Sequence, residues 1–170
     1  MITLIERANS FSERIAIKSD GQNYTYNRLL EQSASVAAYL LQDQKDLNEA
    51  RIAFLVPASF SYAAVQWGIW RAGGIAVPLC EKHPLPSIQY VLEDTKATTV
   101  IYTEAFEELL SPLFKSTNIQ FLKYADITPK KCELPTITLD RRALILYTSG
   151  TTGLPKGVVT THANIEAQIT

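Results

Sequence analysis

Short apolar runs alternate along the chain with stretches in which apolar residues recur at helical spacing. β-prone residues fill 15–18 and 22–24, and the Asp20-Gly21 pair between them favours a tight hairpin because Gly tolerates positive φ. Thr25 then stands where a helix cap is expected. The next apolar and small positions share one helix face: Leu29, Leu30, Ser33, Val36, Ala37, Leu40 and Leu41. The pattern predicts a hairpin followed by a long amphipathic helix.

The rest of the chain repeats a strand followed by a helix. Residues 52–56 (IAFLV) are all apolar, which is typical of a strand buried on both faces, and Pro57 prevents its continuation. A helix from about Ser59 to Ala72 follows, and Gly73-Gly74 ends it. Further strands are expected over 75–79, 98–103, 119–123 and 143–148, with helices over 85–92 and over 105–110 as far as Pro112. Because each crossover lays a helix on the sheet, the sequence predicts an α/β fold, a mostly parallel sheet with helices on both faces.

One stretch resembles a membrane span by composition alone. Residues 52–70 carry no charge for 19 positions. Pro57, Gln66 and Gly68 interrupt the stretch, and its periodicity changes at Pro57. A buried strand followed by a packed helix therefore explains it better than a span.

Composition and charge exclude several classes of function. The 170 residues are 46% hydrophobic and 19% charged, with a net charge of -1, which suits one globular domain and gives no support to nucleic-acid binding. The two cysteines, Cys80 and Cys132, have no ligand spacing, so a reducing compartment is expected. Glu6, Arg7 and Glu13 fall where a secretory signal needs an apolar run. The sequence predicts a cytoplasmic protein that does not enter a membrane.

Residues 149–157 (SGTTGLPKG) stand out chemically. They combine three glycines, three hydroxyl residues, one proline and one lysine. Glycines let backbone N–H groups converge on phosphate oxygens, and the hydroxyls and lysine add donors and charge. Pro155 before Lys156 and Gly157 after it exclude the common nucleotide-triphosphatase loop. The segment predicts a phosphate-binding loop at the carboxyl end of a strand, with a Gly/Thr-rich surface turn as the alternative.

The run YTSGTTGLPKGV, residues 147–158, resembles the signature loop of the adenylate-forming superfamily, which includes acyl-CoA synthetases, peptide-synthetase adenylation domains and firefly luciferase. The segment TTHANI, residues 160–165, resembles the usual continuation, and the likeness covers nearly the whole chain. Residues 64–84 (AVQWGIWRAGGIAVPLCEKHP) and 91–95 (VLEDT) are most similar to the malonyl- and methylmalonyl-CoA synthetase branch.

The resemblance implies an AMP-forming acid–thiol ligase. ATP and a small carboxylic acid would give an acyl-adenylate and pyrophosphate, and coenzyme A would then displace AMP. Lys156 would be the catalytic residue, and Thr151 would supply a hydroxyl near Mg²⁺. By motif position, the residues that would hold the β- and γ-phosphates are Thr148, Ser149, Gly150, Thr151, Thr152, Gly153 and Lys156.

We expect structural rather than catalytic roles for His162 and the two tryptophans. A single histidine without an identifiable partner is weak support for proton transfer, so His162 is expected to orient the loop or cap the last helix. Trp67 and Trp70 are expected in the core.

Enzymes of this superfamily extend far beyond 170 residues. Residues 1–170 are therefore expected to be a partial N-terminal AMP-binding domain, truncated shortly after the loop, with the C-terminal domain absent and no activity alone. Sheet surface left uncovered would favour self-association. The alternatives are a noncatalytic nucleotide- or pyrophosphate-binding module and a fragment that serves only protein contacts.

Overall fold

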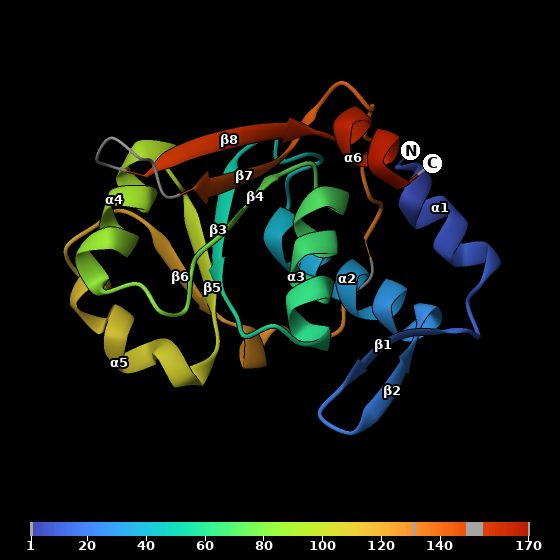
Figure 1. Ribbon diagram of the computed structural model, residues 1–170, viewed down its shortest axis with the longest axis horizontal. Coiled ribbons are helices and arrows are strands. Elements are labelled where there is room, and N and C mark those ends of the chain that lie inside the picture. Colours follow the sequence, from blue (N-terminus) through green and yellow to red (C-terminus); the bar gives the residue numbers. More distant parts are fainter. Residues whose placement is uncertain (1, 131, 149–154, 170) are drawn as a thin grey trace.

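A six-stranded sheet lies at the centre of the computed structural model, which describes residues 2–130, 132–148 and 155–169 (Figure 1). Its strands lie in the order β6-β5-β3-β4-β7-β8. Their bounds are β3 (Arg51–Leu55), β4 (Ile75–Pro78), β5 (Thr99–Tyr102), β6 (Gln120–Lys123), β7 (Arg142–Thr148) and β8 (Lys156–Thr161). The first five pair in parallel and β8 pairs antiparallel with β7. The mostly parallel sheet is confirmed, whereas β8 was not predicted.

Helices cover both faces of this sheet, as expected. Helices α2 (Tyr26–Leu41) and α3 (Phe60–Arg71) pack on one face, and α4 (Leu85–Thr95) and α5 (Glu107–Leu110) on the other (Figure 1). Strand β3 shows why its sequence is apolar throughout: Ile52 and Phe54 point to the α2–α3 side, and Ala53 points to the α4 side. Every second side chain of a strand faces the same way, so a sheet covered twice requires an unbroken apolar run.

The amino-terminal hairpin is confirmed. Strands β1 (Ile15–Ser19) and β2 (Gln22–Thr25) pair antiparallel, and both turn residues have positive φ, 51° at Asp20 and 73° at Gly21. The Thr25 hydroxyl accepts a hydrogen bond from the Arg28 N–H at 3.3 Å, so it caps α2 as predicted.

Two short elements complete the ends of the chain. Helix α1 (Thr3–Ser10) was not predicted, because eight residues hold too few periods for a clear pattern. Ile5 and Ala8 are buried on its inner side, and Ile2, the residue before the helix, is buried too. Helix α6 (His162–Ile169) follows β8 and lies near α1 (Figure 1).

The remaining predicted features need one correction. Helix α5 ends at Leu110 as predicted, but it begins only at Glu107, and the 3-10 turns η1 (Glu104–Phe106) and η2 (Ser111–Leu113) flank it. Pro112 lies at the start of η2, where its missing N–H is not needed. A further turn, η3 (Tyr124–Asp126), follows β6. Residues 52–70 divide between β3 and α3, and Trp67 and Trp70 are buried. Within the described residues, no helix combines the length and apolarity that crossing a membrane requires.

We expect Gly68→Ala to lower the free energy of unfolding by about 1–3 kcal/mol, because a Cβ at Gly68 would lie 2.5 Å from the Cβ and Cγ1 of Val36 where α3 crosses α2. Helix propensity alone predicts the opposite sign, a gain of about 1 kcal/mol. Urea denaturation of both proteins decides between the two effects. An increase in stability would show that the two helices are not in close contact at this position.

Candidate functional site: the base of the loop after β7

The ends of β7 and β8 bring together two of the predicted phosphate-binding residues. Thr148 ends β7, Lys156 begins β8, and the two are paired across the strands. Both are exposed, and within the described part of the chain Lys156 takes part in no ion pair. The other predicted residues lie outside the described residues: Ser149, Gly150, Thr151, Thr152 and Gly153. The described geometry therefore defines the base of the loop, where it leaves and rejoins the sheet.

Helix α4 holds both strands at this base. The Tyr147 hydroxyl donates a hydrogen bond to the Asp94 carboxylate, and the Tyr90 hydroxyl donates to the Pro155 carbonyl oxygen at 3.2 Å. The Tyr90 and Tyr147 rings meet edge to face, with centroids 6.3 Å apart. One helix thus contacts the chain on each side of the predicted loop, and we call these contacts of Tyr90, Asp94, Tyr147 and Pro155 the α4 clamp.

The clamp also fixes the protonation state of Tyr147. Burial raises the pKa of its hydroxyl well above the ordinary value, and the hydrogen bond to Asp94 and the charge of that carboxylate raise it further. The phenol therefore remains a hydrogen-bond donor over the whole physiological range.

Gly157 permits the close approach of the two strands. A Cβ on Gly157 would lie 3.0 Å from Cγ2 of Ile145 and 3.2 Å from the Cε2 and Cζ atoms of the Tyr147 ring. Gly157 lies within β8, opposite Tyr147. A glycine that the sequence attributes to phosphate binding thus has a packing role in the sheet, because the ring of Tyr147 occupies the space beside it.

At the other end of β8, His162 belongs to the core. Its side chain is 3% exposed and meets the Trp70 ring edge-on, with centroids 5.7 Å apart. Burial lowers the pKa of His162 to about 4, and the charge of Arg141 adds to the effect. His162 lies six positions after Lys156 along an extended strand, a distance of roughly 20 Å. A direct contact of His162 with the base of the loop is therefore excluded.

The cap of α6 is Thr161 rather than His162. The Thr161 hydroxyl accepts from the Asn164 N–H at 3.2 Å, and the Asn164 side-chain oxygen accepts from the Thr161 N–H at 3.0 Å. This reciprocal pair is a capping box. It gives the predicted TTHANI segment a local structural reason.

No pattern in the sequence indicated the α4 clamp or the anchor at the start of β7. In that anchor, Arg141 donates to Asp46 at 2.7 and 2.9 Å and to the Gly73 carbonyl at 2.7 Å. The hydrogen bonds from Arg141 hold the pKa of Asp46 below its ordinary value. These partners lie 53 to 95 residues apart in the chain, so no local pattern could have revealed them.

A sequence model described as AMP-binding enzyme matches residues 4–170. The chain belongs to the AMP-binding enzyme family.

In the described part of the chain, no cluster of three His, Cys, Asp or Glu residues could hold a metal ion.

Relatives within the family point to one branch of it. The chain is 38% identical to the mitochondrial malonate–CoA ligase ACSF3 of Mus musculus over 96% of its own length, and 35% identical to that of Xenopus laevis over its full length. It spans about a third of those proteins, 30% and 32% respectively. A malonate–CoA ligase of Arabidopsis thaliana is 30% identical. The sequence resemblance to this branch is confirmed.

Solved structures of the family share the fold. O-succinylbenzoate coenzyme A synthetase of Bacillus subtilis, in complex with AMP, superposes with a TM-score of 0.84 at 25% identity. That match covers 97% of this chain and 43% of the synthetase. The N-terminal subdomain of NpsA from Klebsiella oxytoca gives a TM-score of 0.79 at 25% identity, covering 95% and 42% of the two chains. The fold is that of the N-terminal part of adenylate-forming enzymes.

We expect the Tyr147 hydroxyl and the Asp94 carboxylate to be coupled by about 1 kcal/mol, since a hydrogen bond to a charged acceptor is strong but this pair is solvent-accessible. A double-mutant cycle with Tyr147→Phe and Asp94→Asn, followed by urea denaturation, measures the coupling. Glu93→Gln on the same helix is the matched control, because the Glu93 carboxylate accepts a hydrogen bond from Gln89 of α4 itself rather than from β7. A coupling energy of zero would contradict the clamp.

Stability should fall as the pH is lowered from about 7 to 5 because of His162. The unfolded chain takes up this proton near the ordinary pKa of 6.5, whereas the folded chain resists protonation down to about 4. The unfolded state therefore binds more protons in this window, which costs the fold about 2 kcal/mol by pH 5. His162→Gln should remove most of that loss. Asp46 and Glu49, whose pKa values are lowered, lose their contributions only below their ordinary values of 3.8 and 4.5. If the unaltered chain and His162→Gln lost the same stability between pH 7 and 5, the buried, neutral state of His162 would be contradicted.

Proposed function

We propose that the chain is the N-terminal part of an ATP-dependent acid–thiol ligase that activates a carboxylic acid as an acyl-adenylate and transfers it to coenzyme A. The match of the family model to residues 4–170 carries this proposal. The names of the malonate–CoA ligases describe the same overall reaction for those proteins. Their similarity supports malonate or a related small acid as the substrate.

In this proposal the loop binds the phosphates that leave as pyrophosphate. Thr148 and Lys156 stand at its two ends, and Ser149, Gly150, Thr151, Thr152 and Gly153 lie between them. Negative charge accumulates on pyrophosphate as the bond to the α-phosphate breaks, and preorganised donors stabilise that charge. Lys156 is exposed and forms no ion pair with a carboxylate of the described residues, so its ammonium group is available for this role.

Mg²⁺ belongs to the proposal through the Thr151 hydroxyl. One hydroxyl is too small a set of ligands for this ion, which usually keeps several waters and bridges to substrate phosphates. We therefore propose that the ion arrives with ATP. When bound, it would supply charge neutralisation at the phosphates.

The chain covers residues 1–170 of a proposed longer protein and is expected to be inactive by itself, since it spans about a third of the ligases it matches. A noncatalytic nucleotide- or pyrophosphate-binding module remains the second candidate, because the same loop would serve it. Titration calorimetry of the chain with pyrophosphate and with ATP tests binding in either case, and the absence of binding would favour a role in protein contacts only.

Self-association and a cytoplasmic location are also part of the proposal. Strand β8 forms one edge of the sheet, and Val158 and Val159 on it are 50% and 51% exposed, with Leu146 of β7 at 43%. Exposed apolar edge strands favour pairing with another chain. Sedimentation of the chain would test pairing. Cell fractionation would test the location, which differs from the mitochondria in the names of several relatives.

We expect Lys156→Ala to slow adenylate formation about ten- to hundredfold, corresponding to a loss of roughly 1.5–3 kcal/mol of charge-assisted contact. The assay is isotope exchange between labelled pyrophosphate and ATP, in a protein that carries this chain together with the rest of the enzyme. Lys45→Ala is the matched control, because Lys45 is an exposed lysine in the loop after α2. An unchanged exchange rate would remove Lys156 from the mechanism.

A further inference from the structure

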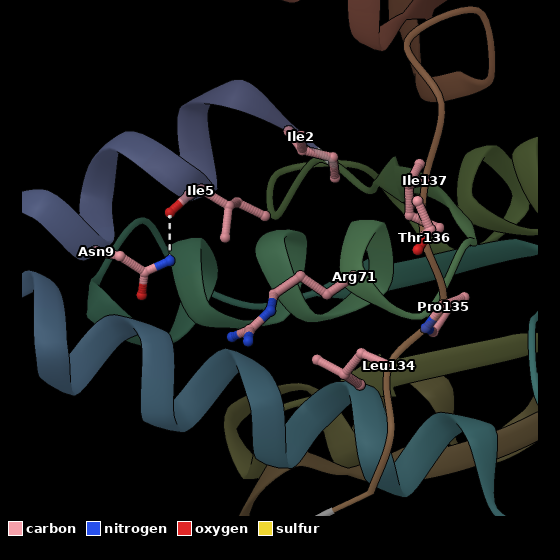
Figure 2. A pocket seen from close by; sticks show the side chains of 8 residues that line it. All are labelled: Ile2, Ile5, Asn9, Arg71, Leu134, Pro135, Thr136 and Ile137. Carbon is pink, nitrogen blue, oxygen red and sulfur yellow. Dashed lines mark hydrogen bonds between the residues drawn. The ribbon is translucent and has the colours of Figure 1, made fainter.

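A cavity of about 240 Å³ lies between α1, α3 and the segment that leads into β7 (Figure 2). Apolar side chains form most of its wall, and one guanidinium, one amide and one hydroxyl interrupt them. The lining residues are Ile2, Ile5, Asn9, Arg71, Leu134, Pro135, Thr136 and Ile137. No step proposed above uses this cavity.

The guanidinium of Arg71 is held by only one of its nitrogens. Nη1 donates to the Leu30 carbonyl at 2.6 Å and to the Ser33 hydroxyl at 2.7 Å, which ties the group to α2. Within the described part of the chain, Nε and Nη2 have no hydrogen-bond partner, and no carboxylate pairs with Arg71. Figure 2 shows the side chain extended from α3 under α1, with its guanidinium below Asn9. The Nε–Nη2 edge is thus left as an unused fork of two donors.

A partly buried cation without a paired carboxylate is unfavourable. Burial lowers the pKa of Arg71, which reports the cost of removing its charge from water, and an interaction with Cys132 offsets only part of this effect. An anion placed against the free edge would offset that cost, because the planar fork of arginine matches two oxygens at once.

The remaining lining decides what kind of anion fits. A phosphate dianion would meet a single cation here with few further donors, since one of the two Asn9 side-chain N–H groups is already used on the Ile5 carbonyl and Thr136 adds a single hydroxyl. Leu134, Pro135 and Ile137 provide an apolar surface instead. A monoanion with an apolar body satisfies both parts of the wall.

We propose that this cavity binds a small aliphatic carboxylate, with its two oxygens on the Nε–Nη2 edge of Arg71 and its chain against Ile5, Leu134 and Ile137. The site is separate from the phosphate loop. Helix α1, which lines the proposed site, also lines a second small cavity together with His162 and Ile165. His162 follows the last residue of β8 and Lys156 is the first, so α1 lies at the end of β8 away from the loop (Figure 1). The proposal therefore does not depend on the function assigned to the loop.

Titration calorimetry of the chain with hexanoate tests the proposal, with hexanol and inorganic phosphate as probes that lack the charge or the apolar body. We expect hexanoate to bind with a Kd of about 1 mM, the value typical of a ligand of about eight heavy atoms, and both other probes to bind at least about tenfold more weakly. Binding of phosphate with equal affinity, or no binding of hexanoate, would overturn the proposal.

Two variants locate the ligand. Arg71→Lys keeps the charge but loses the fork, and Asn9→Trp fills the mouth of the cavity from an exposed position. We expect each to weaken hexanoate binding at least about tenfold, while Lys156→Ala leaves it unchanged. Amide chemical shifts should move at Ile5, Leu134 and Thr136 when hexanoate is added. Should Arg71→Lys fail to fold, Asn9→Trp and the shift map give the answer, and unchanged affinity in Asn9→Trp would refute the site.

Discussion

The position of β7 is the constraint on which the rest of the structure depends. At its start, the Trp70 ring N–H donates to the Ala143 carbonyl at 2.7 Å. Arg141, the residue before β7, donates to the Asp46 carboxylate and to the Gly73 carbonyl. At its end, Tyr147 is bound to Asp94. Strand β4 contributes only one paired position in parallel register, Ala76 opposite Leu144. These side chains therefore fix β7 at both ends, in addition to its antiparallel pairing with β8.

The hydrogen bonds of β7 with Trp70 and with Asp94 connect this strand to the helices on both faces of the sheet. Trp70 belongs to α3 on one face, and Asp94 belongs to α4 on the other. Trp70 and Asp94 therefore contact the same strand from opposite faces of the sheet, one near its start and one near its end. The end of β7 that Asp94 contacts is its carboxyl end, where α/β sheets place their ligands.

The sequence predicted those parts of the fold that rest on local signals. The hairpin, the cap at Thr25 and the buried β3 follow from turn chemistry and periodicity within a few residues. Strand β8 was missed although Val158 and Val159 have strong β propensity, because the glycine-rich motif before them reads as a loop. The α4 clamp needs tertiary contacts between residues 53 and 65 positions apart, which no single sequence reveals.

Lys156 and Arg71 show two opposite ways of presenting a cation. The exposed Lys156 lies in water, so the fold bears little cost for its charge and its contribution arises only when an anion replaces the solvent. Arg71 is already partly removed from water, and its Nη1 bonds keep it there, so the cost of its charge falls on the folded state before any ligand arrives. An anion that binds Arg71 must therefore stabilise the fold itself, by the linkage between ligand binding and unfolding.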